Sequence, residues 1–287
     1  MDMFEAVETR DENHVAGWVT ATDSARLWVE VRGQGRPVIF VHGWTMSSRF
    51  WRRQHGLADS YQIVTLDLRG HGRSETPIRG HTIPRYARDL REVIRALDIK
   101  GATLVGWSMG GSVALEYWQQ FGSDRLSGIA LVESSPYPMA DASWNTHRFR
   151  GLGPEAVQTE MEAMRQDRAA FGSRFVNEMF ISGQAPAHAL RWMCAEHLLT
   201  DDQTAAAVYE DYAARDYVPL LPSLTLPALA VYGRSRHMCF GPSAGRFVAG
   251  SIPGAHLAVL ERSGHLPFYE EPDTFNAEIR RFLSALT

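Results

Sequence analysis

Ser108 is the residue of this 287-residue chain whose surroundings most clearly suggest chemistry, because it lies in a G-x-S-x-G segment, GWSMG, at 106–110. An apolar run at 102–105 precedes the segment, and a helical pattern follows it at 112–121. In such a strand-to-helix turn the serine is strained and its hydroxyl exposed, and the flanking glycines avoid clashes that side chains would cause. The pattern predicts that Ser108 is a nucleophile, while a tight turn without chemistry is the alternative.

His265 is the candidate base, because a serine hydroxyl needs a neighbouring base to act as a nucleophile at neutral pH. It lies in the segment SGHLP, 263–267, between the last apolar run and a final helical pattern at 274–286. Loops that follow parallel strands open at the same edge of a sheet. We therefore expect His265 to lie near Ser108; the alternative is a histidine that only supports its loop.

Two backbone amides are predicted to form an oxyanion hole, which needs preorganised N–H donors. One is the amide of Met109, directly after the nucleophile, at the start of a helix that favours negative charge. The other is the amide of Trp44, in the loop that follows the apolar run 37–41. His42, in the same loop, is interpreted as a structural residue that braces it.

The elements that must position these residues alternate along the chain. Amphipathic helical patterns such as 84–97 and 112–121 lie between short apolar runs, which read as buried parallel strands at 37–41, 63–66, 103–105, 129–132, 229–232 and 257–260. This alternation predicts an α/β fold, with a mostly parallel sheet and helices on both faces. Segment 25–31 partly alternates apolar with polar residues and is predicted to be an antiparallel edge strand.

One long segment, 137–219, interrupts the alternation. It has no convincing buried strand, and 155–170, 187–199 and 202–214 read as helices. The simplest interpretation is a helical cap inserted between two strands of one core domain, which comprises 1–136 and 220–287. A separate helical domain is the alternative.

Several short motifs occur in a fixed order: HGW at 42–44, DLRGHGRS at 67–74, GWSMGG at 106–111 and GH at 264–265. Together they resemble the α/β-hydrolase superfamily, from about residue 25 to the C-terminus. The resemblance implies an eight-stranded-type sheet, a Ser–acid–His triad, an oxyanion hole and a cap that shapes the substrate pocket. The glycine-rich segment 69–74 lacks the Lys-Ser/Thr of a phosphate-binding loop and is interpreted as a structural turn.

The acid of the triad is where this sequence departs from the superfamily. The position after the next-to-last strand that usually carries an aspartate holds Arg236, whose guanidinium cannot accept a histidine N–H. Glu133, at the end of the apolar run 129–132, is available instead. Certain haloalkane dehalogenases and lipases place the acid after this earlier strand, so we predict that Glu133 orients His265. The alternative is a glutamate that only caps backbone amides.

A serine in the strand-to-helix turn at 106–110 favours attack on a carbonyl group and an acyl-enzyme intermediate. This chemistry predicts hydrolysis of an ester, thioester or lactone. Four aromatic residues are predicted to bind a hydrophobic acyl or aryl group: Trp107, Tyr137, Trp144 and Trp192. Cofactor-free haloperoxidase or perhydrolase activity and carbon–carbon bond hydrolysis remain alternatives on the same scaffold. Arg236 also keeps open a catalytically weak ligand-binding receptor.

The composition of the chain limits the kinds of binding partner and cellular location that we expect. Hydrophobic residues make up 45% of the chain and charged residues 22%, and the net charge of -4 argues against a nucleic-acid-binding surface. The acidic N-terminal segment does not read as a secretory signal, and no apolar stretch is long enough to span a membrane. Cys194 and Cys239 are interpreted as reduced thiols, consistent with a cytoplasmic location. We expect no cofactor or metal, and a monomer or homodimer.

Overall fold

A single mixed sheet organises the chain in the computed structural model, which describes residues 4–11, 13–235, 238 and 240–286. Among these residues the sheet has nine strands in the order β1-β2-β3-β5-β4-β6-β7-β8-β9. The strands are β1 (Phe4–Asp11), β2 (His14–Thr20), β3 (Arg26–Arg32), β4 (Pro37–Val41), β5 (Gln62–Leu66), β6 (Ala102–Trp107), β7 (Leu126–Val132), β8 (Ala228–Tyr232) and β9 (His256–Val259). The predicted α/β fold class is confirmed.

Strand direction divides the sheet into two parts. The strands β5, β4, β6, β7, β8 and β9 are parallel, whereas β1, β2, β3 and β5 pair antiparallel. The predicted strand 25–31 corresponds to β3 and is antiparallel, but it is not at the edge, because β2 pairs along its whole length. The strands β1 and β2 were not predicted: β1 is rich in charged residues, whereas β2 is mostly buried and contains Gly17, a residue type that is uncommon in strands.

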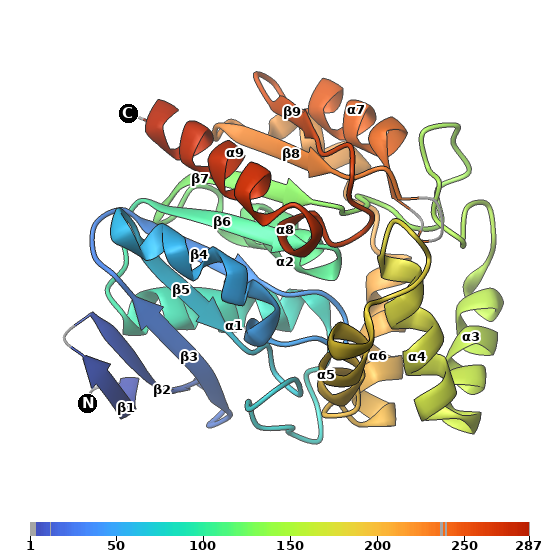
Figure 1. Cartoon of the computed structure of the whole chain (residues 1–287), viewed down its shortest axis with the longest axis horizontal. Helices are drawn as coiled ribbons and strands as arrows, with labels where there is room; N and C mark the ends of the chain where they lie inside the picture. Colours follow the sequence, from blue (N-terminus) through green and yellow to red (C-terminus); the bar gives the residue numbers. More distant parts are fainter. Residues whose placement is uncertain (1–3, 12, 236–237, 239, 287) are drawn as a thin grey trace.

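Helices cover both faces of the sheet (Figure 1). The helices α1 (Ile83–Ala96) and α2 (Met109–Phe121) pack together behind the sheet in this view. In front lie the 3-10 helix η1 (Ser48–Asp59), α8 (Pro267–Glu270) and α9 (Pro272–Ala285), while α7 (Pro242–Ser251) packs beside β8 and β9. Thr82 caps α1 by accepting a hydrogen bond from the Arg85 amide, and the apolar side of α1 is buried.

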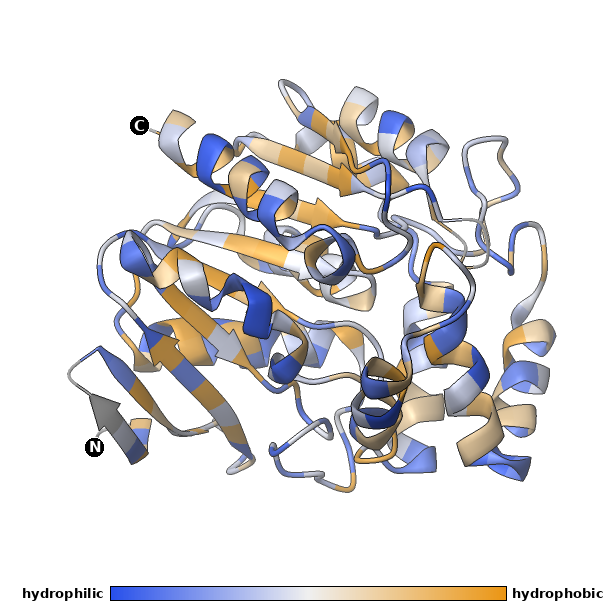
Figure 2. Ribbon diagram, viewed as in Figure 1, coloured by the Kyte–Doolittle hydropathy of each residue, from blue (hydrophilic) through white to orange (hydrophobic). Residues whose placement is uncertain are grey.

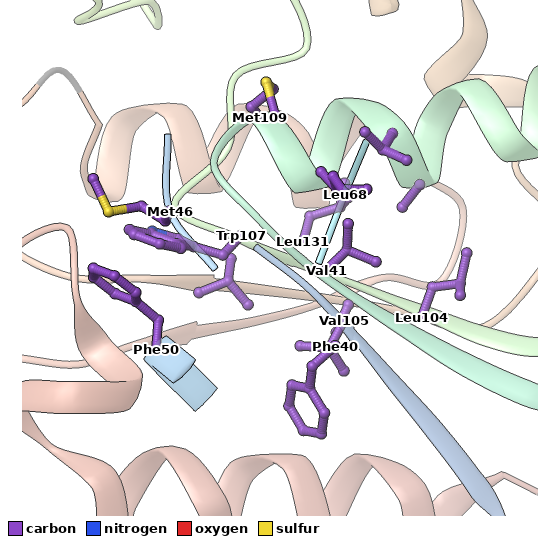
Figure 3. Packing of buried hydrophobic residues seen from close by; sticks show 14 of the residues in the cluster. Phe40, Val41, Met46, Phe50, Leu68, Leu104, Val105, Trp107, Met109 and Leu131 are labelled. Carbon is purple, nitrogen blue, oxygen red and sulfur yellow. The ribbon is translucent and has the colours of Figure 1, made fainter. Parts of the chain in front are cut away.

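The hydrophobic core lies on both sides of the central strands, which are predominantly apolar in Figure 2. The strand β6 is buried along its whole length, as expected for a parallel strand covered on both faces. Figure 3 shows Phe40, Val105 and Trp107 within this core, and the rings of Phe50 and Trp107 stack at 5.4 Å. The turn that carries Ser108 is therefore attached to a rigid support.

Four helices and the short 3-10 helix η2 (Val218–Ser223) form the segment between β7 and β8, 133–227, which is described throughout and contains no strand. The four helices are α3 (Pro154–Gln166), α4 (Arg168–Met179), α5 (Ala187–His197) and α6 (Asp202–Ala214). The helix expected at 155–170 is divided at Asp167, whose side chain caps α4 by accepting a hydrogen bond from the Ala170 amide. Figure 1 shows α3 to α6 gathered at the end of the sheet to which the parallel strands point.

Candidate active site

Ser108 occupies a strained turn between β6 and α2. Its backbone has φ 55° and ψ −122°, a conformation that side-chain-bearing residues rarely adopt. Two hydrogen bonds hold it: the Ser108 amide donates to Val132 O at 2.9 Å, and the Ser134 hydroxyl donates to Ser108 O at 2.9 Å. The strain places the serine outside both the strand ladder and the helix, and its side chain is half-buried.

The two glycines of the motif are required by close backbone packing. A Cβ atom added at Gly106 would collide with the carbonyl of Gly110, and one added at Gly110 would collide with that of Val41. The elbow therefore presses directly against the end of β4. This contact also brings the loop after β4 next to Ser108, since a Cβ at Gly43 would lie 3.2 Å from Ser108 Cβ.

Glu133 and His265 form a buried pair. The Nδ1 atom of His265 lies 3.1 Å from Oε2 of Glu133, and both residues are at most 2% exposed. The other carboxylate oxygen of Glu133 accepts a hydrogen bond from the Gly233 amide at 2.6 Å. The Glu133 backbone continues the β7–β8 ladder through a bond to Val231 O, with φ 45°, which aims the side chain across β8. Arg236 lies outside the described residues.

His265 is fixed by its surroundings as well as by its acid partner. Its amide donates to Met179 O at 2.7 Å, and its carbonyl accepts from Trp107 Nε1 at 2.9 Å. The ring of Phe240 stacks on the imidazole at 4.8 Å between centroids and 13° between planes. The imidazole can therefore rotate little about its side-chain bonds.

Burial disfavours charge on both members of the pair. It raises the pKa of the Glu133 carboxyl, although the Gly233 amide opposes this by stabilising the carboxylate, and it lowers the pKa of His265. When the shared proton lies on Nδ1, the Nε2 atom is an unprotonated base. The carboxylate then offsets the positive charge that the ring gains if Nε2 takes a proton.

The backbone amides of Trp44 and Met109 are predicted to form an oxyanion hole. Neither the Trp44 nor the Met109 N–H has a hydrogen-bond acceptor among the described residues. Met109 is the first residue of α2, where backbone N–H groups have no partner within the helix. The Trp44 loop is attached to α6 by a hydrogen bond from the indole Nε1 to Ala205 O at 2.8 Å.

His42 braces this loop, as the sequence predicts. Its Nδ1–H donates to Gly43 O at 2.8 Å, and its Nε2 accepts from the Leu68 amide at 2.9 Å. Burial lowers the pKa of His42 well below its usual range, so the ring stays neutral. With both nitrogens occupied, it is not a second base.

A small cavity surrounds Ser108 and His265. Its volume is about 20 Å³, the space needed by roughly one water molecule. The other residues of its wall are mostly aromatic: Trp44, His147, Arg148, Phe175, Tyr209, Tyr212, Met238 and Phe240. Several come from the segment between β7 and β8, so that segment closes over the serine. A larger cavity of about 320 Å³, lined by Arg49 and Asp67 among others, includes neither Ser108 nor His265.

The four aromatic residues predicted to bind substrate do not line this cavity. Trp107 is 1% exposed and packs in the core beneath His265. Trp192 packs against Phe50, and Trp144 stacks on Phe247. Tyr137 contributes a backbone carbonyl to its own loop.

Most of the residues that do line the cavity were not predicted from the sequence. Tyr209 and Tyr212 are three positions apart on α6, so they share a helix face, and this spacing was a usable signal. His147 and Phe240 lie in loops, where no periodicity marks the side chains that face inward.

Side chains of the segment DLRGHGRS, 67–74, stabilise the fold. The Asp67 carboxylate accepts hydrogen bonds from the amides of Ser48 and Arg73, and burial raises its pKa to about 6. The buried Arg69 guanidinium forms a two-point ion pair with Asp89. These contacts support the interpretation of the segment as a structural turn.

The Alpha/beta hydrolase family model matches residues 38–278, which cover most of the chain and include the elbow and the Glu133–His265 pair. The chain belongs to the α/β hydrolase family. The recognised superfamily is thus confirmed, whereas the unusual position of the acid remains a prediction.

The proteins that this chain resembles include haloperoxidases and esterases. The non-heme chloroperoxidase CPO-A1 of Kitasatospora aureofaciens is 27% identical over 92% of this chain and 98% of its own length. A pimeloyl-acyl-carrier-protein methyl ester esterase of Vibrio cholerae is 27% identical over 89% of this chain and 97% of its own. An esterase from Exiguobacterium antarcticum has a similar structure, with a TM-score of 0.85, 25% identity and coverage of 93% of this chain and 99% of its own.

Within the described part of the chain, no group of three or more His, Cys, Asp and Glu residues could hold a metal ion. No helix there is long and apolar enough to cross a membrane. Cys194 is a half-buried free thiol, and Cys239 lies outside the described residues.

Proposed function

We propose that this protein is a serine hydrolase that cleaves a carboxylic ester, or a related lactone or thioester, through an acyl-enzyme. Ser108 is the nucleophile, His265 the general base and Glu133 the acid that orients it. The observation that carries the proposal is the buried contact between His265 and Glu133 on the edge where the elbow presents Ser108. Esterase relatives and esterase structural neighbours support ester hydrolysis as the reaction class.

The reaction follows from the position of each group. Nε2 of His265 removes the Ser108 proton as the oxygen attacks the ester carbonyl, and the amides of Trp44 and Met109 stabilise the resulting oxyanion. His265 then donates the proton to the leaving alkoxide, which departs as an alcohol. Water, activated by the same nitrogen, attacks the acyl group and releases the carboxylic acid and free Ser108.

The segment 137–219 acts as a cap in this proposal. Phe175 of α4 and the pair Tyr209 and Tyr212 of α6 form part of the wall around Ser108, which favours a hydrophobic acyl or aryl group. A cavity of about 20 Å³ has no room for such a group. The cap therefore shifts when substrate enters, as lids commonly do.

A second candidate activity is perhydrolysis on the same acyl-enzyme. It is favoured by the haloperoxidase names of several relatives, including a non-heme haloperoxidase of Rhodococcus erythropolis that is 26% identical. Hydrogen peroxide replaces water as the attacking group, so the acyl group leaves Ser108 as a peroxy acid. The acylation step and its residues are unchanged.

A fluorophosphonate probe tests the proposed nucleophile. We expect rapid labelling of the wild-type protein at Ser108, and none of Ser108→Ala. Hydrolysis of 4-nitrophenyl esters of increasing acyl length should show turnover in the wild-type protein alone. A well-folded wild-type protein that neither reacts with the probe nor hydrolyses any ester would refute the enzyme and favour a ligand-binding role.

Peroxide separates the two candidate reactions. With an acetate ester and millimolar hydrogen peroxide, a perhydrolase yields peracetic acid in preference to acetate, although water is in large excess. A hydrolase yields acetate alone. Either product must disappear in Ser108→Ala if it arises from the acyl-enzyme.

A further inference from the structure

His147 is a buried polar residue of the Ser108 cavity that the proposed mechanism does not use. It is 6% exposed and lies in the loop between β7 and α3. It contributes to the same cavity wall as Ser108 and His265. A histidine among mostly aromatic wall residues is available for a specific polar contact.

The loop that carries His147 is built around Asn145, which is 1% exposed. The Asn145 side-chain amide donates to Pro138 O at 2.9 Å and to Ala140 O at 2.8 Å. Its carbonyl oxygen accepts from the His147 amide at 3.0 Å. This buried network fixes the backbone of His147, so the ring is held in place relative to the cavity.

The contacts of His147 also determine where its proton lies. Nδ1 accepts a hydrogen bond from the Phe149 amide at 3.2 Å, so Nδ1 carries no proton. Burial, assisted by the charges of Arg148 and His265, lowers the pKa of His147 to about 3, so the ring is neutral. The proton is therefore on Nε2, which donates to no other described residue and is not among the fully buried polar atoms, so it remains accessible.

Phe240 contacts both His147 and the proposed base His265. Its ring stacks on His265 at 4.8 Å and meets His147 edge-on at 5.4 Å, with an angle of 73° between the planes. Phe240 therefore contacts both imidazoles, and His147 lies near His265 in the wall of the Ser108 cavity.

We propose that the Nε2–H of His147 binds a second acceptor oxygen of the substrate, so that the enzyme prefers esters with an ether or carbonyl oxygen near the scissile group. This specificity role rests on the proposed function, since it assumes that an ester occupies the Ser108 cavity. The physical reason is that a largely enclosed N–H donor rewards a substrate that satisfies it and disfavours one that places a methylene there.

Matched substrates measure this preference. 4-Nitrophenyl methoxyacetate and 4-nitrophenyl butanoate have the same length and differ by one oxygen on the acyl side. 2-Methoxyethyl acetate and butyl acetate make the same comparison on the alcohol side. For each pair we compare the ratio of kcat/KM values between wild type and His147→Phe, because intrinsic reactivity cancels in that comparison.

In at least one pair, we expect His147→Phe to lower the ratio of kcat/KM for the ether-containing ester to kcat/KM for its all-carbon counterpart by about tenfold. His147→Gln, which retains an N–H near the position of Nε2, should keep most of the preference. His188→Phe, at an exposed histidine outside the cavity, should leave both ratios unchanged. If His147→Phe does not fold, His147→Met makes the same test.

Equal ratios for wild type and folded His147→Phe in both substrate pairs would overturn the inference. Failure of the proposed function is separately visible, because the wild-type protein would then not react with the fluorophosphonate probe. Normal labelling of His147→Phe by the probe shows that Ser108 and His265 still work in the variant.

Discussion

His265 and Glu133 lie 132 positions apart in the chain, yet Nδ1 of the first is 3.1 Å from Oε2 of the second. The contact exists because β7 and β8 are neighbours in the sheet and the positive φ of Glu133 directs its side chain across the end of β8. The Gly233 amide, at the end of β8, holds the other oxygen of the carboxylate. The sheet thus fixes the Glu133 carboxylate beside His265, which is why we propose Glu133, and not a residue of the loop after β8, as the acid.

Glu133→Gln should lower kcat/KM by about ten-thousandfold while the protein remains folded. The glutamine carbonyl would accept from the Gly233 amide, so its NH₂ group would face His265 Nδ1. That arrangement favours the tautomer with the proton on Nε2, which cannot take the Ser108 proton. Steady-state kinetics and a thermal melt check the two parts. Glu133→Gln with nearly full activity would show that another group orients His265.

Phe240→Leu should change the pH dependence of kcat/KM. Burial lowers the pKa of His265, and the stacked Phe240 ring contributes to that burial. Removing the ring admits water, so the pKa rises toward the ordinary value for histidine. Because activity needs neutral His265, the acid limb of the profile should move to higher pH. Phe247→Leu, on a ring stacked with Trp144, is the control; identical profiles for both variants would contradict this role.

Gly43→Ala should impair formation of the oxyanion hole. The new Cβ would lie 3.2 Å from Ser108 Cβ and 3.2 Å from the Trp107 ring, so the Trp44 amide must move away from the nucleophile. We expect kcat to fall by about a hundredfold, as when one oxyanion donor is lost. Gly56→Ala is the matched control, because a Cβ there meets nothing within 4 Å. Unchanged kcat in Gly43→Ala would place the oxyanion hole elsewhere.

Asp89→Ala should destabilise the fold without affecting chemistry. It removes two hydrogen bonds to the buried Arg69 guanidinium but leaves the ion pair with Asp23, so we expect the unfolding free energy to fall by about 1.5–3 kcal/mol. Urea denaturation measures this, and Asp59→Ala, in an exposed pair with Arg280, should leave the midpoint nearly unchanged. A large drop in kcat/KM of the folded Asp89→Ala protein would instead assign the 67–74 segment a role in binding.

The sequence by itself was sufficient for the turn at Ser108 and for the positions of the parallel strands along the chain. Both depend on local rules, since a buried strand needs an apolar run and the turn at Ser108 needs Gly106 and Gly110, whose added side chains would strike neighbouring backbone. His265 follows from the same rules, because a loop after a parallel strand opens at a known edge. The strands β1 and β2 were not predicted because β1 is rich in charged residues and β2 shows no regular alternation of buried and exposed positions.

Only the tertiary structure decided what surrounds the serine. Trp107 and Trp192 pack into the core, while Tyr209 and His147 reach the cavity, and residue type does not distinguish these outcomes. The partner of His265 likewise depends on which strands are adjacent, and no local pattern reports adjacency. Local sequence determines backbone conformation and strand burial, whereas the cavity wall arises from contacts between segments that are distant in the chain.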